Sequence, residues 1–398
     1  MTARRVVVTG CGAVTPLGDL APSLAAIAAG TTALAEPTLL DPAPFASRLG
    51  AEVGAFDARA HFRKPKALKL TDRRTRLAVA ACATAVADAG ICGEALEGAG
   101  VLLGTASSDL LAADLARALA PDPGRRSATD VPFFAGRVLD GLNPLWLLQV
   151  LPNLASAHVA IQLGARGPNS TAMTDAAAGL QAIGEAASWI AGGECDAAVA
   201  GGADTAMHPV AWAGYEQAGL FEPDASGRRF APGEGSAALV LEARERALAR
   251  GARPKGELLG FGAVGPAGGE TAAALGRAVG EALAGRELPG SAAPVLALDA
   301  LRPASERAAL QAVLRLAAGA APDAEVLDVT ASAGHALAAA GPIAAALLLQ
   351  GLAPPGAAIL VASLGLSGQA AALLLVRAGE EPTITRPDPG LPPGPRRS

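Results

Sequence analysis

The chain has 398 residues, enough for two average domains or for one large fold with several layers of helix and sheet. Hydrophobic residues make up 51% of it but aromatic residues only 3%, so the apolar mass is alanine, leucine and valine, which suits closely packed helices and buried strands. A net charge of -5 gives no general attraction to nucleic acid or to anionic lipid. Binding to nucleic acid is therefore disfavoured.

The cysteines argue against a metal site and against a disulfide framework. They lie far apart without CxxC spacing, at Cys11, Cys82, Cys92 and Cys195. We therefore expect no bound metal and a reducing, cytoplasmic location.

The N-terminus predicts no export, and the longest uncharged stretch predicts no membrane span. A short strand-like stretch meets Gly10 near the N-terminus, which leaves no room for the apolar core of a secretory signal. No formally charged residue occurs between Asp328 and Arg377, but prolines and glycines divide this stretch into short pieces. The stretch is predicted to be buried core, and no membrane partner is expected.

Strand and helix signals alternate through the first half of the chain. Asp72 is placed to begin a helix and Gly90 to end it, and two glycines, Gly201 and Gly202, are expected to follow a short apolar strand. The predicted elements are a strand over 6–8, a helix over 71–89, a helix over 176–191 and a strand over 195–200. This order is typical of βαβ units.

The second half repeats the alternation. Its predicted elements are a strand over 295–299, a helix over 306–317, a strand over 325–329, a helix over 336–350, and two strands over 357–363 and 369–376 joined in a hairpin by the turn 365–368. We expect two related halves, 1–245 and 246–380, and a proline-rich tail over 381–398 that is disordered.

Several segments resemble the β-ketoacyl synthase family, in family order over nearly the whole chain. They are LPNLASAHVAIQLGARGPNST at 151–171, GLQAIGEA at 179–186, VVVTGCGAVTPLG at the N-terminus, GEG at 233–235 and GHALAAAG at 334–341. The first two resemble the segment that flanks the family's nucleophile. The resemblance implies a thiolase-like α/β fold, with two βαβ-rich halves in five α/β/α/β/α layers.

The nucleophile itself is missing. An active member of this family needs a cysteine on a tight turn at a helix N-terminus, where the helix dipole and backbone N–H groups favour the thiolate and bind the thioester oxyanion. The local sequence TDAAAG, at 174–179, places Ala176 where the family motif TAC has its cysteine. The nearest cysteine in the sequence is Cys195, on the next strand. We therefore expect no acyl-enzyme.

Three further site positions have changed. In the family, two histidines stabilise the enolate oxygen that forms when malonyl-carrier protein loses carbon dioxide. Asp299 aligns with the first histidine, and an anion there would oppose an enolate. Thr330 aligns with the family's lysine and Leu366 with the phenylalanine of its glycine-rich gating turn. His335 is retained, and without its partners it is expected to be a structural core histidine.

The segment 63–76 is basic in a chain that is acidic overall. Its one acidic residue is Asp72, and its basic residues are Arg63, Lys64, Lys66, Lys69, Arg73, Arg74 and Arg76. Two interpretations remain open: a solvated helix face, or a docking surface for an acidic acyl carrier protein. Glu234, in the GEG loop beside a predicted buried strand, is expected to make an internal hydrogen bond or ion pair.

These observations predict a non-catalytic subunit that resembles a chain-length factor. It would form a heterodimer with an active ketosynthase and shape the tunnel for the growing polyketide or polyene chain. Phosphopantetheine would arrive on the acyl carrier protein, with no cofactor bound to this chain. The resemblance implies tunnel or interface positions at Leu110, Leu111, Phe133 and Phe134. The alternatives are a malonyl-carrier-protein decarboxylase or thioester hydrolase that uses His335, and a homodimeric scaffold.

Overall fold

Apart from one short strand, the described strands form two five-stranded groups with the same pairing pattern. The computed structural model describes residues 4–106, 132, 135–136, 145, 150–223, 227, 229–266, 271–286 and 294–379. In sheet order, the first group is β4 (Asn169–Ala172), β3 (Gly100–Gly104), β5 (Ala197–Thr205), β6 (Glu234–Ala243) and β1 (Val6–Thr15). The second is β9 (Val326–Leu327), β8 (Val295–Ala300), β10 (Ala358–Leu364), β11 (Ala370–Arg377) and β7 (Gly256–Val264). A short strand, β2 (Gly18–Asp19), pairs with β1.

The order of parallel and antiparallel pairs is the same in both groups. β4, β3 and β5 are parallel neighbours, as are β9, β8 and β10, whereas the last two pairs of each group are antiparallel. Antiparallel pairing of β1 with β7 joins the groups over a short register in which Val6 faces Leu258. This internal repeat supports our proposal that the halves divide between β6 and β7, close to residue 245.

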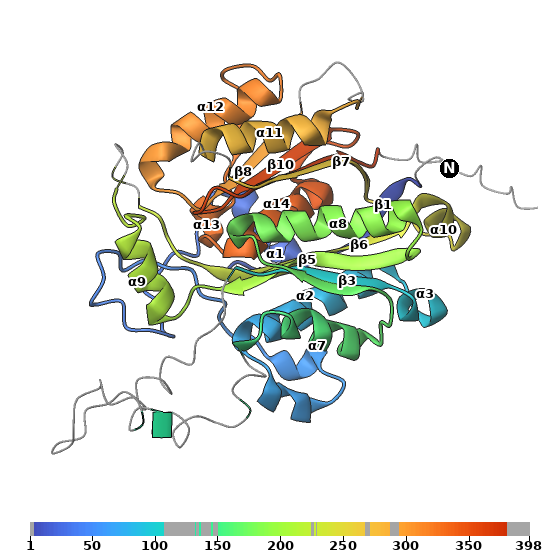
Figure 1. Ribbon diagram of the computed structural model, residues 1–398, viewed down its shortest axis with the longest axis horizontal. Coiled ribbons are helices and arrows are strands. Elements are labelled where there is room, and N and C mark those ends of the chain that lie inside the picture. The colour runs from blue at the N-terminus through green and yellow to red at the C-terminus, as the bar shows by residue number, and fades with distance from the viewer. Residues whose placement is uncertain are drawn as a thin grey trace, which may run out of the picture.

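Helices cover both groups and separate them (Figure 1). α2 (Arg73–Ala89) and α7 (Leu154–Leu163) lie on the outer face of the first group, and α11 (Thr271–Leu283) and α12 (Arg307–Ala317) cover the second. Between the groups lie α8 (Ala178–Gly192) and α14 (Ala340–Leu347), each in contact with both. The result is the expected order of α/β/α/β/α layers.

The remaining helical segments connect these layers. The α-helices are α1 (Leu20–Ala28), α3 (Gly93–Glu97), α9 (Pro209–Gln217), α10 (Arg244–Ala249) and α13 (Thr330–Ala333). Short 3₁₀ turns lie at Ala58–His61, Pro65–Leu70, Asp175–Ala177, Ala304–Glu306 and Leu337–Ala339, and a π-helical segment lies at Leu348–Leu352.

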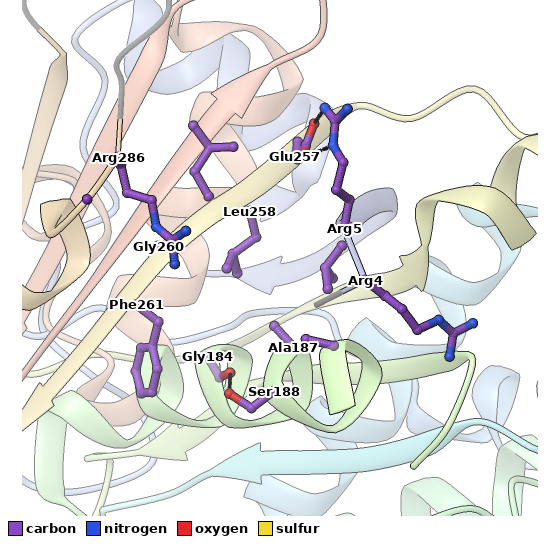
Figure 2. A pocket seen from close by; sticks show the side chains of 14 residues that line it. Arg4, Arg5, Gly184, Ala187, Ser188, Glu257, Leu258, Gly260, Phe261 and Arg286 are labelled. Carbon is purple, nitrogen blue, oxygen red and sulfur yellow. Dashed lines mark hydrogen bonds and ion pairs between the residues drawn. The ribbon is translucent and has the colours of Figure 1, made fainter. Parts of the chain in front are cut away.

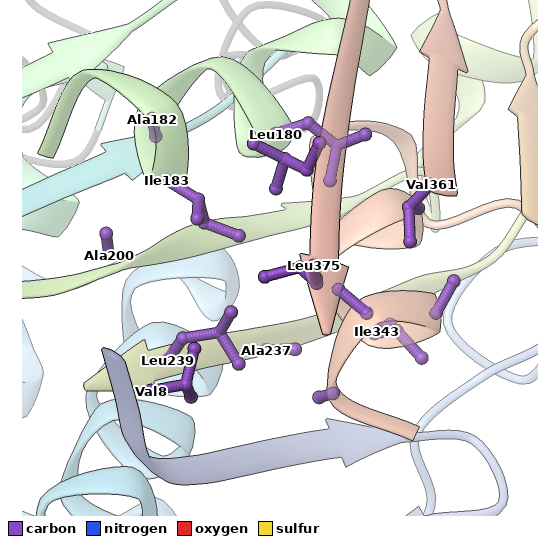
Figure 3. Close-up of a cluster of buried hydrophobic side chains, with 14 of the residues drawn as sticks. Val8, Leu180, Ala182, Ile183, Ala200, Ala237, Leu239, Ile343, Val361 and Leu375 are labelled. Atoms are coloured by element: carbon purple, nitrogen blue, oxygen red, sulfur yellow. The ribbon is translucent and has the colours of Figure 1, made fainter. Parts of the chain in front are cut away.

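The main hydrophobic core lies around the central helix layer (Figure 3). Ile183 of α8, Leu239 of β6, Ile343 of α14 and Leu375 of β11 are all buried in it. Because α14 lies inside the molecule, the uncharged stretch before Arg377 is core, as predicted. None of the described helices is long and apolar enough to cross a membrane.

Small residues allow the layers to approach closely. The helix predicted at 71–89 is α2, with the Asp72 carboxylate accepting a hydrogen bond from the Thr75 N–H at its start and Gly90 at its end. The strand predicted to stop before Gly201 instead continues to Thr205 as β5. A Cβ on Gly201 would lie 2.0 Å from the Ala237 carbonyl oxygen, so this glycine permits close contact and does not mark a turn.

Candidate functional site

The turn before α8 contains Ala176, which the family resemblance aligns with the nucleophile. Ala176 belongs to the short 3₁₀ turn Asp175–Ala177 and is fully buried. Asp175 has a φ of 57°, in the left-handed region that aspartate adopts more readily than most residues. A Cβ on Gly104 would lie 2.2 Å from the Ala178 carbonyl carbon, so the end of β3 packs directly on the helix start. The turn is sharp and tightly held, but its side chain at 176 is a methyl group.

Asp299 and His335 form a buried pair beside this turn. The His335 Nδ1 atom accepts a hydrogen bond from the Leu337 N–H at 3.1 Å, so the proton of the neutral ring lies on Nε2. Nε2 is 2.6 Å from Asp299 Oδ1, and the Ser363 hydroxyl donates to Asp299 Oδ2 at 3.2 Å. His335 is 1% exposed and Asp299 is 3% exposed. A carboxylate thus lies within ion-pair distance of the histidine ring, at the position that the sequence comparison aligns with the family's first histidine.

Thr330 makes a different contact. Its hydroxyl donates to Asp328 Oδ1 at 2.6 Å, and its backbone N–H donates to the same oxygen. Asp328 also pairs with the Arg307 guanidinium. These contacts hold the start of α13 and give Thr330 a local structural role.

Leu366 lies over the nucleophile turn. Its N–H donates to Asp175 Oδ2 at 2.5 Å, and its carbonyl oxygen accepts from the Arg302 guanidinium at 2.9 Å. Its side chain packs against a buried cluster that includes Ala176 and Leu337. The structure therefore brings the positions 176, 299, 335 and 366 into one small region, as the family resemblance implies.

Asp175 and Arg302 were missed by the sequence analysis. Burial raises the pKa of the Asp175 carboxyl, while hydrogen bonding from the Leu366 N–H acts in the opposite direction. The available signal was an acidic residue directly before the nucleophile position, where the family motif has alanine. No comparable signal marked Arg302.

A series of hydrogen-bonded polar side chains connects the site to α2, β3 and β5. The Arg74 guanidinium donates to the Thr105 hydroxyl at 2.9 Å, and that hydroxyl donates to Asp204 Oδ1 at 3.3 Å. The other Asp204 oxygen accepts from the Ala106 N–H at 2.6 Å and from the Ala338 N–H at 3.4 Å. These bonds connect α2, β3 and β5 to the segment that carries His335.

Fewer basic residues of the segment 63–76 are exposed than its sequence suggests. Arg73 donates two hydrogen bonds of 2.6 Å to the fully buried Glu234 carboxylate, so the expected internal ion pair of Glu234 is present. Arg74 is 1% exposed and lies 3.0 Å from Asp72. Neither arginine is available to dock a partner. The exposed members are Arg63, Lys64, Lys66 and Lys69, which we call the basic patch.

Two larger cavities lie away from these residues. One, of about 590 Å³, is lined by Ala187 of α8 and Leu258 of β7, with Arg4, Arg5 and Arg286 around it (Figure 2). The other, of about 620 Å³, lies beside it and shares Arg5. Neither is lined by a residue of the candidate site. Among the described residues there is no group of three or more histidine, cysteine, aspartate or glutamate side chains that could hold a metal ion.

Comparisons with known proteins identify the family and the fold. Residues 3–247 match the family model described as "Beta-ketoacyl synthase, N-terminal domain". The 3-oxoacyl-[acyl-carrier-protein] synthase 2 of Synechocystis sp. is 34% identical over 275 residues, which cover 65% of this chain and 62% of that protein. The enzyme of the same name from Staphylococcus aureus is 30% identical over 66% of this chain and 64% of its own length. The match thus spans less than two thirds of these relatives.

Among solved structures, the ishigamide ketosynthase/chain length factor superposes with a TM-score of 0.79 at 26% identity, covering 95% of this chain and all of the matched chain (100%). The layered architecture is therefore a thiolase-like fold. The chain belongs to the β-ketoacyl synthase family.

Proposed function

We propose that this chain is a non-catalytic, chain-length-factor-like subunit that pairs with an active ketosynthase. The observation that carries the proposal is the altered site: a methyl group stands at the nucleophile position, and a buried carboxylate faces the one retained histidine at 2.6 Å. The likeness to the ishigamide ketosynthase/chain length factor supports the same assignment. The test is whether co-expression with a ketosynthase that has its full Cys-His-His set yields a 1:1 complex in native mass spectrometry.

An independent enzymatic function is less well supported. A decarboxylase or hydrolase built on His335 would need a donor beside that ring and access for a substrate. The ring nitrogen instead faces Asp299, and both side chains are almost completely buried. Release of carbon dioxide from malonyl-carrier protein by the isolated chain would favour this alternative over the proposed one.

One edge of the first strand group is suited to a partner. β4 ends the sheet order and pairs with β3 alone among the described strands, so no described strand pairs with its outer edge. Exposed large apolar side chains occur in the sequence on either side of it, at Leu145, Leu151, Ile161 and Met173. Ile161 of α7 is 65% exposed and Met173, next to β4, is 53% exposed. Exposed apolar side chains and a strand edge without a described partner each favour burial against another subunit. A homodimeric scaffold would use the same surface, and the native mass measurement distinguishes the two.

We further propose that the acyl carrier protein docks on the basic patch and brings phosphopantetheine with it. The matched relative is named for an acyl-carrier-protein substrate. Four exposed cations lie close together on and beside the 3₁₀ turn Pro65–Leu70, in a chain whose net charge is -5. Their charge would steer an acidic partner toward this face.

Reversing the charge of the patch is expected to weaken this docking. The double substitution Lys64→Glu/Lys66→Glu should lower the affinity of the heterodimer for the carrier protein by about tenfold or more at low salt, and the difference should shrink as salt is added. Biolayer interferometry at several salt concentrations measures it. Arg253→Glu, an exposed arginine in the other half of the chain, is the control and should have little effect. Equal affinities for all variants would show that the patch is only solvated surface.

The tunnel role rests on the family resemblance, because Leu110, Leu111, Phe133 and Phe134 lie outside the described residues. If they form the tunnel wall, Phe133→Ala or Phe134→Ala should shift the products toward longer chains, and Leu110→Trp toward shorter ones, while the complex stays intact. Product analysis by mass spectrometry and size-exclusion chromatography together test this. Unchanged product length in an intact complex for every variant would contradict it.

A further inference from the structure

Asp175 connects the degenerate nucleophile turn directly to the gating turn 365–368. Its Oδ2 atom accepts a hydrogen bond of 2.5 Å from the Leu366 N–H. A Cβ on Gly365 would lie 2.9 Å from that same oxygen, so the carboxylate is packed against the backbone of the turn. The family motif has alanine at this position, and a methyl group has no atom that can accept the bond.

Arg302 binds the backbone carbonyl group of Leu366. Its guanidinium donates to the Leu366 carbonyl oxygen at 2.9 Å. The same guanidinium also donates to both carboxylate oxygens of Glu306, at 2.9 and 3.1 Å, which fixes its orientation. Asp175 and Arg302 reach Leu366 from different segments, the turn before α8 and the loop after β8. Both backbone groups of Leu366 are therefore bound by charged side chains.

The turn is also closed internally. The Gly368 N–H donates to the Gly365 carbonyl oxygen at 3.1 Å, and the Gly365 N–H donates to the Gln369 carbonyl oxygen at 2.8 Å. A turn with these bonds moves as a unit, so its position depends on its outer attachments. The Leu366 side chain packs against the cluster that contains Ala176, which is 0% exposed.

We infer that Asp175 and Arg302 form a clamp that holds the turn 365–368 closed over Ala176 and shields the side chain at 176 from acyl groups. The inference rests on the proposed function only for the identity of the excluded ligand, an acyl group carried as a thioester. The clamp would block acylation independently of the missing nucleophile. A thiol placed at 176 would still be covered by the turn 365–368. Losing one charge-assisted hydrogen bond of this kind should raise the open population by about 10- to 100-fold.

Alkylation of a thiol placed at 176 tests the clamp without a carrier protein or a partner. In a Cys92→Ser background, the exposed native thiol is absent and the other three cysteines are buried. Burial raises the pKa of Cys11 and of Cys82 to about 12 and also raises the pKa of Cys195, which disfavours their reaction. Ala176→Cys should react slowly with iodoacetamide, as followed by intact mass. Asp175→Ala/Ala176→Cys, which restores the family's TAC motif, should react at least tenfold faster. Asp175→Asn/Ala176→Cys keeps an oxygen acceptor and should stay slow.

Substitution of Arg302 tests the other half of the clamp independently. Arg302→Met/Ala176→Cys should also react faster, whereas Arg315→Met/Ala176→Cys should not, because Arg315 donates to the Ala324 carbonyl oxygen far from the site. Cys82 reports unfolding, since it lies in the core of the first half. Should a double variant fail to fold, hydrogen exchange of the Leu366 amide in Asp175→Ala decides instead, with accelerated exchange expected and wild-type protection contradicting the clamp.

The outcomes separate the clamp from the proposed function. Equal alkylation rates for Ala176→Cys alone and with Asp175→Ala or Arg302→Met would overturn the clamp and leave the non-catalytic assignment unaffected. Acylation of the unmodified chain would overturn the non-catalytic assignment and leave the alkylation result unaffected.

Discussion

Replacing Arg73 by methionine is expected to lower the free energy of unfolding by about 3–5 kcal/mol, because it leaves the Glu234 carboxylate buried without its cation. Glu234 is 0% exposed and accepts two hydrogen bonds from Arg73, one from the Val53 N–H at 2.8 Å and one from the Thr205 hydroxyl at 3.0 Å. The two neutral donors would remain, but they do not balance a full charge. The measurement is urea denaturation followed by circular dichroism.

Arg63→Met is the matched control, because it removes the same side chain from the same basic segment. Arg63 is exposed, and its guanidinium reaches the Leu163 carbonyl oxygen at 3.2 Å without a buried carboxylate partner. Its loss should change the free energy of unfolding by about 0.5 kcal/mol or less. A loss at Arg73 no larger than that at Arg63 would show that the Glu234 pair contributes little to the fold.

Ala176→Cys alone is expected to leave the isolated chain without malonyl-dependent chain extension. Removal of one donor from an oxyanion site lowers turnover by about 10²–10³-fold, and the resemblance places Asp299 and Thr330 where the family has its first histidine and its lysine. Asp299 adds a carboxylate at the position where the enolate would need a donor, 2.6 Å from His335. A thiol at 176 that became acylated would therefore still lack the decarboxylation step.

Chain extension is measured by mass spectrometry of the carrier-bound products. The single variant is compared with Ala176→Cys/Asp299→His/Thr330→Lys, which replaces all three missing groups. The triple variant should extend chains faster than Ala176→Cys alone. Robust extension by the single variant in the absence of a partner would mean that Asp299 does not occupy the position of the family's histidine.

The fold was largely predictable from local patterns. The start of α2 at Asp72 and its end at Gly90 followed from a cap residue and a glycine around an apolar repeat, and both were confirmed. The end of β5 was not predictable, because Gly202 serves contact with a segment more than a hundred residues away: a Cβ there would lie 2.1 Å from the Ala338 carbonyl oxygen. Glycine thus ends a helix at Gly90 but permits close backbone contact at Gly202.

The candidate site was predictable only as far as the family motifs extend. They located Ala176, Asp299 and His335, and the structure places these residues together. The charge pattern over 63–76 could not separate exposed from internal cations, because the partners of Arg73 and Arg74 are decided by tertiary packing. The contacts of Asp175 and Arg302 with Leu366 join segments that are distant in the sequence, and no local sequence pattern predicts such contacts.

The central claim is that this chain contributes to a ketosynthase complex without itself carrying an acyl group. Intact-mass analysis of the complex with an active ketosynthase, after reaction with acyl-carrier protein, tests it most directly. We expect a 1:1 complex in which the partner gains one acyl group and the mass of this chain is unchanged, because Ala176 has no nucleophilic atom. A stoichiometric acyl adduct on this chain that maps to the candidate site, or failure of the chain to associate with any active ketosynthase, would contradict the account.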